Sequence, residues 1–493
     1  MTGVCRDEAT DRSQLRRVLT ACLLTGFAVL IDQNMIAVAL PTIERDLRMT
    51  TPQATWAASG YVLAIALTLV VGGRLGDDYG RRRVLLVSMS FFVLAAAGCS
   101  LAPSGTWFVV SRACVGCAAG LVNPQIIGIM HHMFGGHDRG RAFGFYSATI
   151  SFAGVFAPLL GGALISMSHA WQPAFYPSAI IGLVGLVWGR LLLPADPPGR
   201  APARIDLIGI VLLGLSIVLI VLPVAEAGER DVHPIWWLAA AGPAFFAAFC
   251  WWEKDLELRD RVPLVRLRLL RVRSYWVGAL TEAFFFAGYP GMLLLSQFYF
   301  QQGLHYSALL AGATTMTCGL ASTLAAILGG RLVDRYGRRL VVGGCMTVIV
   351  GMSLSAVIMT TRVGGGTALT LIAPFVMCGI GAGLIMAPNQ TLTLAEVPRT
   401  EGSTAAGVYQ VGMRIGQSLG MSFALSLYSA GLARWHGDIP KATAIGISAS
   451  GVLVILALVT RLGDILWSYR ERREITTDEV PVRVSSVSDE PCP

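Results

Sequence analysis

The stretch Gly73-Arg74-Leu75-Gly76-Asp77-Asp78-Tyr79-Gly80-Arg81-Arg82-Arg83 separates two long apolar runs of the chain. The pattern returns 257 residues later as Gly330-Arg331-Leu332-Val333-Asp334-Arg335-Tyr336-Gly337-Arg338-Arg339-Leu340, with eight of eleven positions identical. Glycine permits a tight backbone turn, whereas Asp and Arg are costly inside a bilayer and favour its face. The two copies therefore predict two loops at a membrane surface and an internal duplication of the chain.

The composition of the chain is typical of a membrane protein. Of its 493 residues, 54% are apolar and 14% are charged, which departs strongly from the balance of a soluble domain. Apolar windows of about 20 residues are long enough to cross a bilayer as helices. They lie near 18–40, 54–73, 84–103, 106–130, 142–165, 172–193, 206–225, 233–252, 274–300, 306–329, 340–360, 367–394, 404–431 and 442–466. The sequence therefore predicts an all-α polytopic membrane protein with 14 transmembrane helices.

The basic residues indicate which side of the membrane the loops occupy. With an even number of spans both termini lie on one side, and Lys and Arg favour the cytoplasmic side. The tails, the loops on their side and the adjoining helix ends hold 30 of the 38 Lys and Arg residues, the opposite loops hold six, and Arg112 and Arg414 lie within spans. Both termini are therefore expected in the cytoplasm of a bacterial cell, with the chain in its inner (plasma) membrane. The polar first sixteen residues do not resemble a cleavable signal, so the first helix is expected to remain.

The 257-residue offset maps the ninth predicted span onto the first. Helices 9 to 14 then repeat helices 1 to 6, and helices 7 and 8 are an inserted linking pair. The predicted organisation is a cytoplasmic N-tail (1–17), an N-terminal six-helix half (18–193), a linker region with helices 7 and 8 (194–273), a C-terminal six-helix half (274–466) and a disordered cytoplasmic tail (467–493). Two six-helix repeats with a site between them at the bilayer midplane are typical of alternating-access carriers.

Several short motifs resemble one family. The repeated pattern G-x-L-x-D-x-x-G-R-R resembles the loop between helices 2 and 3 of the major facilitator superfamily, and Ile31-Asp32-Gln33-Asn34-Met35-Ile36-Ala37-Val38-Ala39-Leu40-Pro41 resembles the first-helix motif of its fourteen-helix drug:proton antiporters. Motif residues of helices 2, 4 and 5 of that branch are matched by Trp56, Tyr61, Arg112, Gly116, Ala119, Gly154, Pro158, Gly161 and Gly162. Val115 and Ala157 depart from the pattern, which leaves the class intact and the substrate range open.

Asp32 and Arg112 are the expected proton-coupling residues. Desolvation inside a membrane penalises the charged form of a carboxyl group, so an Asp in a span can take up and release a proton. A guanidinium stays charged at any working pH, and the resemblance implies that Arg112 takes part in a proton relay by acting on a carboxylate. The alternative for both residues is a structural ion pair.

The two charged loops are expected to form a conformational latch. Asp77 lies at the end of helix 2, where it can pair with Arg81 or face the N-terminus of a helix in the opposite half. The residues assigned to the latch are Gly73, Asp77, Gly80, Arg81, Arg82, Gly330, Asp334, Gly337 and Arg338.

Helix 5 is expected to have a mechanical role. Its small residues allow close helix approach and its proline allows a bend. The resemblance to antiporters implies that Gly154, Pro158, Gly161 and Gly162 seal one side of the site in one state, with ordinary tight packing as the alternative.

A substrate cavity is expected between the two halves. Aromatic faces and a carboxylate suit lipophilic cations through cation–π and charge attraction. By the offset, Glu282 lies seven residues before the position that matches Asp32, which places it on the same helical face. Structural pairing of Glu282 with a loop Arg or with Arg414 is the alternative. The candidate cavity residues are Glu282, Trp56, Tyr61, Tyr289 and Arg414.

The function predicted from the sequence is proton-coupled secondary active efflux of lipophilic cationic drugs or of an antibiotic by alternating access. Proton-coupled transport of one specific metabolite, by export or uptake, is the alternative. An enzyme is disfavoured because the one cluster, His131, His132 and His137, lacks a carboxylate or Cys at ligand spacing, and a ligand sensor would need a large soluble domain. The protein is expected to act as a monomer on a small molecule and protons in the lipid bilayer, driven by the proton-motive force, with no catalytic residue, cofactor, metal or nucleic acid.

Overall fold

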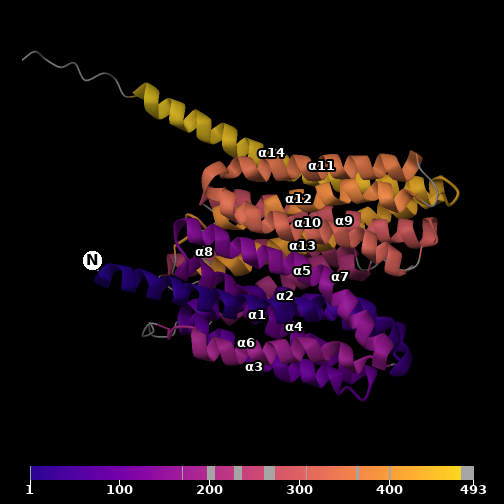
Figure 1. The fold of residues 1–493 in the computed structure, drawn as a ribbon, viewed down its shortest axis with the longest axis horizontal. Helices are drawn as coiled ribbons and strands as arrows, with labels where there is room; N and C mark the ends of the chain where they lie inside the picture. Colours follow the sequence, from indigo (N-terminus) through magenta and orange to yellow (C-terminus); the bar gives the residue numbers. More distant parts are fainter. Residues whose placement is uncertain are drawn as a thin grey trace, which may run out of the picture.

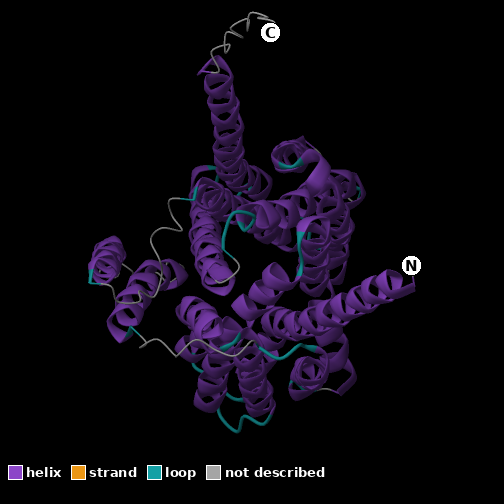
Figure 2. Ribbon diagram, turned by 90° about the vertical axis from the view of Figure 1, so that its left-hand side faces the viewer, coloured by secondary structure: helices purple, strands orange, loops and turns teal. Residues whose placement is uncertain are grey.

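A bundle of long helices makes up the computed structural model of the chain (Figure 1). The structure describes residues 2–168, 170–196, 206–226, 236–259, 272–306, 308–361, 366–398 and 401–478, and this part contains no β-strand. Figure 2 shows the helices from the side at which the chain begins. The predicted all-α class is confirmed for the described residues.

The helices follow one another along the chain with short connections. The first group comprises α1 (Thr2–Asp46), α2 (Thr51–Tyr79), α3 (Arg81–Ser100), α4 (Gly105–Met133), α5 (Gly136–Ser168), the 3-10 helix η1 (Gln172–Phe175) and α6 (Tyr176–Leu192). Next come α7 (Leu207–Glu226) and α8 (Trp236–Leu258). The last group comprises α9 (Arg273–Phe298), the π-helix η3 (Tyr299–Gly303), α10 (Ala308–Tyr336), α11 (Arg338–Thr361), α12 (Thr367–Thr393), α13 (Gly402–Arg434) and α14 (Ile439–Asp478).

Glycine turns and polar caps fix the helix ends that matter for the site. Gly80 has a φ of 98° between α2 and α3, and Gly337 has a φ of 50° between α10 and α11, a conformation that glycine adopts without a steric penalty. The carboxylate of Asp196 accepts hydrogen bonds of 3.0 Å from the backbone N–H groups of Arg82 and Arg83. It therefore satisfies free donors in the first turn of α3.

Two helical bundles pack against each other. Helices α1 to α6 form the first bundle and α9 to α14 the second, while α7 and α8 pack on one another and α7 contacts α2 and α13. Between the bundles, α5 lies against α10 and α12, and α13 lies against α2 and α4. These contacts bring α1, α4 and α13 close to the centre of the molecule.

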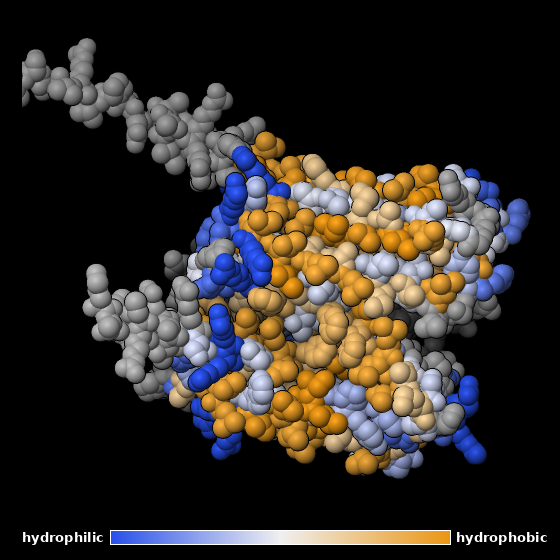
Figure 3. Space-filling view, in the orientation of Figure 1, coloured by the Kyte–Doolittle hydropathy of each residue, from blue (hydrophilic) through white to orange (hydrophobic). Residues whose placement is uncertain are grey.

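The surface of the molecule is suited to a membrane. Figure 3 shows hydrophobic side chains around the middle of the bundles and hydrophilic ones toward both ends. Among the described residues, eleven helices are long and apolar enough to cross a membrane. Helices also occupy the other three predicted windows, as α7, α8 and α13, without meeting that standard in the described part. The protein is a multi-pass membrane protein, and the count of fourteen spans stays a prediction.

The two ends of the chain differ from the sequence prediction. Helix α1 begins at Thr2, within the predicted N-tail 1–17, and α14 continues to Asp478, within the tail 467–493 that was expected to be disordered. Arg, Glu, Leu and Ala are good helix formers, so a charged segment can extend a helix past an apolar span. Both helices project from the same end of the bundles (Figure 1), which we call the terminal end. Parts of the predicted linker region (197–205, 227–235 and 260–271) and of the tail (479–493) lie outside the described residues.

Candidate functional site

Asp32 and Arg112 form an ion pair in the interior of the first bundle. Arg112 Nη1 of α4 donates to Asp32 Oδ2 of α1 over 2.6 Å, and neither side chain has any exposed surface. Ser178 of α6 donates to the other carboxylate oxygen at 3.2 Å. Both charges are costly to bury alone, so the pair holds three helices around one carboxylate. The structure brings together the two residues that the sequence assigned to proton coupling.

Tyr61 of α2 lies directly against this pair. The guanidinium carbon of Arg112 lies 4.1 Å from the centre of the Tyr61 ring, which is cation–π distance. Tyr61 is 1% exposed, and its hydroxyl has no hydrogen-bond partner among the described residues. Of the predicted cavity aromatics, Tyr61 is the one that the structure places beside the coupling pair.

Gln33 and Arg414 make a polar contact between the two bundles. Arg414 Nη2 of α13 donates to Gln33 Oε1 of α1 over 3.1 Å. Arg414 is 8% exposed, its Nε has no partner, and no carboxylate of the described residues lies within ion-pair distance of it. Because Gln33 follows Asp32 in α1, the coupling pair and the contact between bundles are adjacent in sequence and in space.

Glu282 of α9 lies in a second buried cluster, inside the second bundle. Asn389 Nδ2 of α12 donates to Glu282 Oε2 at 2.7 Å and lies 3.3 Å from the hydroxyl of Tyr409. Arg461 of α14 donates to the amide oxygen of the same Asn389. Glu282 is 3% exposed, and its hydrogen-bond partner is an amide rather than Arg414.

Asp464 extends this second cluster to three arginines. Its carboxylate oxygens lie 3.1 Å from Arg273, 3.0 Å from Arg338 and 3.6 Å from Arg461. The sequence analysis missed Asn389, Tyr409, Arg461 and Asp464. Arg461 and Asp464 could have been identified from the sequence, because they are charged residues inside the apolar span predicted at 442–466.

Asp77 connects the bundles at the terminal end. Its Oδ2 accepts hydrogen bonds from Thr404 N at 2.9 Å and from Thr404 Oγ1 at 2.8 Å, while Arg81 Nη2 lies 2.8 Å from its Oδ1. Thr404 lies in the first turn of α13, where free N–H groups attract a negative charge. Gly73 allows this approach, because a Cβ at that position would lie 2.5 Å from the carbonyl oxygen of Ser403. Asp77 therefore makes both of the contacts considered for it.

The second copy of the charged loop is arranged differently. Gly330 packs on the backbone of Gly140 and Gly144 in α5, so it also lies between the bundles. Arg338, however, pairs with Asp464 within the second bundle, whereas its counterpart Arg81 pairs with Asp77. The loop copies share a glycine contact across the interface and differ in the partner of this arginine.

Of the helix 5 motif residues, Gly161 packs within the first bundle. A Cβ at Gly161 would collide with Met35 of α1, whereas one at Gly154 would meet nothing within 4 Å. Pro158 lies inside the continuous helix α5. Contact with the second bundle comes instead from other α5 residues, including a 2.9 Å hydrogen bond between Ser151 and Ser322 of α10.

Two predicted cavity aromatics lie apart from this centre. Trp56 is 38% exposed. Tyr289 stacks on Phe285 of its own helix, and its hydroxyl lies 3.1 Å from the sulfur of Cys318 in α10. Neither residue contacts Asp32, Arg112 or Arg414 in the described structure.

His131, one of the three histidines of the cluster considered in the sequence, is buried at a contact between the bundles. It has no exposed surface, and its Nε2 lies 3.1 Å from the carbonyl oxygen of Val397, in the segment that follows α12 in the other bundle. Its Nδ1 lies 3.2 Å from Arg139. The end of α4 packs under the connection from α12 to α13, which covers the ring. His132 is exposed, and the side chain of His137 lies outside the described residues.

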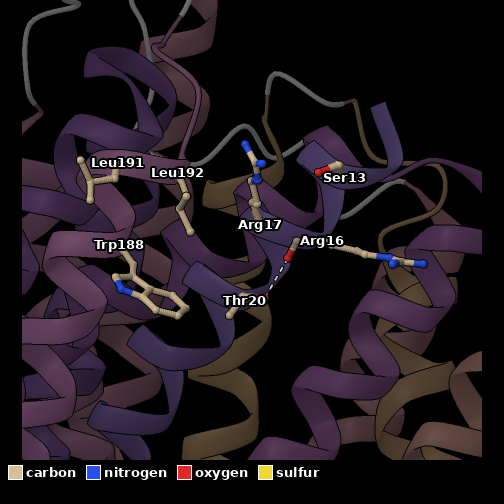
Figure 4. A pocket seen from close by; sticks show the side chains of 7 residues that line it. All are labelled: Ser13, Arg16, Arg17, Thr20, Trp188, Leu191 and Leu192. Atoms are coloured by element: carbon tan, nitrogen blue, oxygen red, sulfur yellow. Dashed lines mark hydrogen bonds between the residues drawn. The ribbon is translucent and has the colours of Figure 1, made fainter. Parts of the chain in front are cut away.

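A surface hollow of about 650 Å³ lies between α1 and α6 near the terminal end (Figure 4). Its walls are formed by Ser13, Arg16, Arg17, Thr20, Trp188, Leu191 and Leu192. The side chains of Arg16 and Arg17 point in different directions (Figure 4). Arg17 is fifteen residues from Asp32 along α1, about 22 Å at the rise of an α-helix. The hollow is therefore separate from the buried charges.

The described residues contain no group of three His, Cys, Asp or Glu side chains that could hold a metal ion. Taken together, the apolar helices, the buried ion pair and the polar contact between two bundles define a multi-pass membrane protein whose charged groups lie between helices. Residues 22–421 match the Major Facilitator Superfamily, so the chain belongs to this family. Its members are membrane transporters, which are not enzymes and need no cofactor.

Curated relatives and solved structures agree with this assignment. The chain is 31% identical over 407 residues to the probable actinorhodin transporter of Streptomyces coelicolor, an alignment that covers 81% of this chain and 70% of that protein. It is 29% identical over 481 residues to the puromycin resistance protein of Streptomyces alboniger, covering 94% and 92% of the two chains. The structure of the proton:xylose symporter XylE bound to 6-bromo-6-deoxy-D-glucose has the same fold, with a TM-score of 0.65, 16% identity and coverage of 91% of this chain and 95% of that one.

Proposed function

We propose that the protein is a proton-coupled secondary active exporter of lipophilic drugs or of an antibiotic, in the fourteen-helix drug:proton antiporter branch of its family. The observation that carries the proposal is the buried pair of Asp32 and Arg112, one residue away from the Gln33–Arg414 contact between the bundles. Protonation of Asp32 removes the charge that holds Arg112 in place. A proton at Asp32 is therefore coupled to the interface that alternating access must open.

The proposed architecture is two six-helix repeats with α7 and α8 as an inserted pair. Both ends of α10 lie 257 positions after the corresponding ends of α2, and α11 begins 257 positions after α3. The match between the sequence offset and the helix bounds supports the duplication. Fourteen spans follow if α7, α8 and α13 also cross the bilayer.

The terminal end is the proposed cytoplasmic end of the protein in the bacterial inner membrane. The excess of Lys and Arg in the loops of that end supports this orientation, and it places both termini in the cytoplasm. The latch at Asp77 is closed at this end, so the structure corresponds to a state that is closed toward the cytoplasm. We treat the transporting unit as a monomer that exchanges a small molecule for protons.

The direction of transport is inferred from the curated relatives. One is called a probable actinorhodin transporter and another a puromycin resistance protein, which favours export of an antibiotic or drug. Proton-coupled transport of one specific metabolite, by export or uptake, is the second candidate. The contact of Arg414 with Gln33 favours this second candidate. A single charged side chain with one polar partner would select a narrower range of substrates than a wide apolar cavity.

The pairing of the buried carboxylates bears on the charge of the substrate. A lipophilic cation was expected because a free carboxylate would lie in the cavity. In the described structure Asp32 is neutralised by Arg112, and Glu282 is held by Asn389 beside Arg461. The geometry therefore gives a cation no unpaired carboxylate at the contact between the bundles.

Substitution of Asp32 by Asn tests the coupling. The amide keeps the size of the side chain and removes its titration, so proton-driven transport should stop while ligand binding persists. One proton moving down about 140 mV supplies about 3 kcal/mol, enough for a substrate gradient of roughly 200-fold. Puromycin movement in proteoliposomes, with and without an imposed pH gradient, measures this, and Asp46→Asn, at an exposed position of the same helix, is the control. Normal pumping by Asp32→Asn would show that another residue carries the proton.

A further inference from the structure

One face of α13 forms the second bundle's side of the central interface. Ser403 lies against Gly73, Gly407 lies against the backbone of α2, and Arg414 bonds to Gln33 of α1. These positions are spaced by about whole helical turns, so they share one face. Gln410 lies on that face, one turn before Arg414, and is 6% exposed.

Several polar atoms near Arg414 and Arg112 are hydrogen-bond donors that have no acceptor among the described residues. Arg414 Nε, Gln410 Nε2, Tyr61 Oη and the Nε and Nη2 atoms of Arg112 are buried and have no partner among the described residues. Buried polar groups in native proteins are nearly always paired. The acceptors of α4 that also lack a partner, in Asn123 and Gln125, lie eleven and thirteen residues from Arg112 along the helix.

The formal charges at this place do not cancel. Asp32 balances Arg112 in a direct ion pair, whereas Arg414 has only the uncharged amide of Gln33 as its partner among the described residues. A guanidinium keeps its charge even when buried. The cluster of Asp32, Arg112 and Arg414 therefore carries one net positive charge in a region where an isolated charge is costly.

Aromatic side chains of α5 and α1 follow one another along the first bundle, beginning with Tyr146 near Arg414. Tyr146 of α5 lies near Arg414 and against α1 at Gly26. Six residues further along α5, Phe152 stacks on Phe156, with ring centres 5.2 Å apart, and on Phe27 of α1 at 5.9 Å. These aromatic side chains can pack against a flat apolar group whose acidic end faces Arg414.

We propose that the central site binds an aromatic acid, with a carboxylate or phenolate as the group that Arg414 recognises. The planar guanidinium can bind two oxygens of a carboxylate when Gln33 releases it, and Gln410 and Tyr61 supply further donors on the same side. The inference rests on the proposed exporter and names the chemical class of its substrate. It reverses the cationic preference expected from the sequence.

Two dyes that share a xanthene ring system and differ in charge test the proposal. Fluorescein is an anion at pH 7.5 and rhodamine 123 is a cation. Binding of each dye to the purified full-length protein is measured by fluorescence anisotropy. The wild type should bind fluorescein at least tenfold more tightly than rhodamine 123. Arg414→Gln should weaken fluorescein binding by tenfold or more and leave rhodamine 123 unchanged, whereas Arg414→Lys should retain part of the affinity.

Matched variants separate recognition from folding. Arg434→Gln changes an exposed arginine of the same helix and should bind both dyes as the wild type does. Gln410→Leu should weaken fluorescein binding by a smaller factor than Arg414→Gln. The proposal is overturned if rhodamine 123 binds as tightly as fluorescein, if neither dye binds, or if Arg414→Gln weakens both dyes equally.

Transport of the same dyes distinguishes failure of this proposal from failure of the proposed function. In proteoliposomes, fluorescein that binds but does not respond to a pH gradient would refute proton coupling and leave the acid site standing. Gradient-driven movement of rhodamine 123 alone would refute the acid site and leave the proton-coupled exporter standing.

Discussion

Thr404 gives both of its donors to one oxygen of Asp77, with its N–H at 2.9 Å and its hydroxyl at 2.8 Å. The two residues belong to different bundles and are 327 positions apart in sequence. Their contact joins α2 to α13 within the proposed latch, beside the approach of Gly73 to Ser403. In the proposed alternating-access cycle it breaks when the terminal end opens, so its strength is expected to contribute to the balance between the two proposed states.

Asp77→Asn should therefore shift the protein toward a state that is open at the terminal end. Hydrogen bonds to a charged acceptor are stronger than those to a neutral one by about 1–2 kcal/mol, which corresponds to roughly a tenfold change in population. Double electron–electron resonance measures the distance between two spin labels, placed at the exposed positions Arg83 and Arg335. This distance should be longer in the variant.

Asp78→Asn is the matched control for this experiment. Asp78 pairs with Arg74 at 2.8 Å within α2, so its substitution should leave the distance distribution unchanged. Equal effects of the two substitutions, or no effect of Asp77→Asn, would refute the latch.

Glu282→Gln should lower the thermal stability of the protein and reduce transport of all substrates together. Asn389 can still donate to the new amide, but the charge that faces Arg461 across Asn389 is lost. The loss of one charge-assisted hydrogen bond is expected to cost about 1–2 kcal/mol. Thermal unfolding in detergent and transport of fluorescein and rhodamine 123 measure the two effects, with exposed Glu257→Gln as the control. A selective loss of rhodamine 123 transport would instead show that Glu282 contacts the substrate.

Much of this fold could be predicted from the sequence, because length, apolarity and the repeated glycine loop depend on residues that are neighbours in the chain. The partners of the buried charged residues could not be predicted from the sequence. Hydropathy indicates how deep in the membrane Arg461 and Arg112 lie. It does not indicate which neighbouring helix they face, because a helix that is apolar on all sides has no polar face to fix its rotation about its own axis. The contacts of Glu282 with Asn389 and of Asp464 with Arg338 depend on that rotation.

Asp464→Asn should strongly destabilise the second bundle. The side chain of Asp464 has no exposed surface. Substitution by Asn removes its negative charge, which is the common counter-ion of three arginines on α9, α11 and α14. Breaking a buried ion pair from one side typically costs about 3–5 kcal/mol. The unfolding temperature in detergent should fall sharply, and adding Arg461→Met should recover part of the loss.

An exposed ion pair provides the comparison for this variant. Asp438 pairs with Lys441 at 2.8 Å, and the side chain of Lys441 is 57% exposed. Asp438→Asn should therefore leave the unfolding temperature almost unchanged. A similar small effect at Asp464 would mean that water or lipid already compensates its arginines.

The proposed fourteen-span topology can be tested with reporters fused at three described helix ends. Fusions after Asp196 and after Arg259 should be cytoplasmic, and a fusion after Glu226 should be on the outer face, because α7 and α8 then cross the bilayer as a pair. Alkaline phosphatase, which is active only outside the cytoplasm, gives the readout. An inactive fusion after Glu226 would support twelve spans.

The contact of Gly330 with Gly140 and Gly144 bears on how fast the protein can work. At this crossing of α5 and α10 the backbone of Gly330 lies directly against the backbones of Gly140 and Gly144, and the side chain of Val333 packs beside them on Gly140. Helices that meet in this way can slide past each other by a shear motion without a change of rotamer at the point of contact. We therefore expect the barrier between the two proposed states to include little repacking where the glycine backbones meet, and the polar contacts on either side of the crossing to contribute more to it.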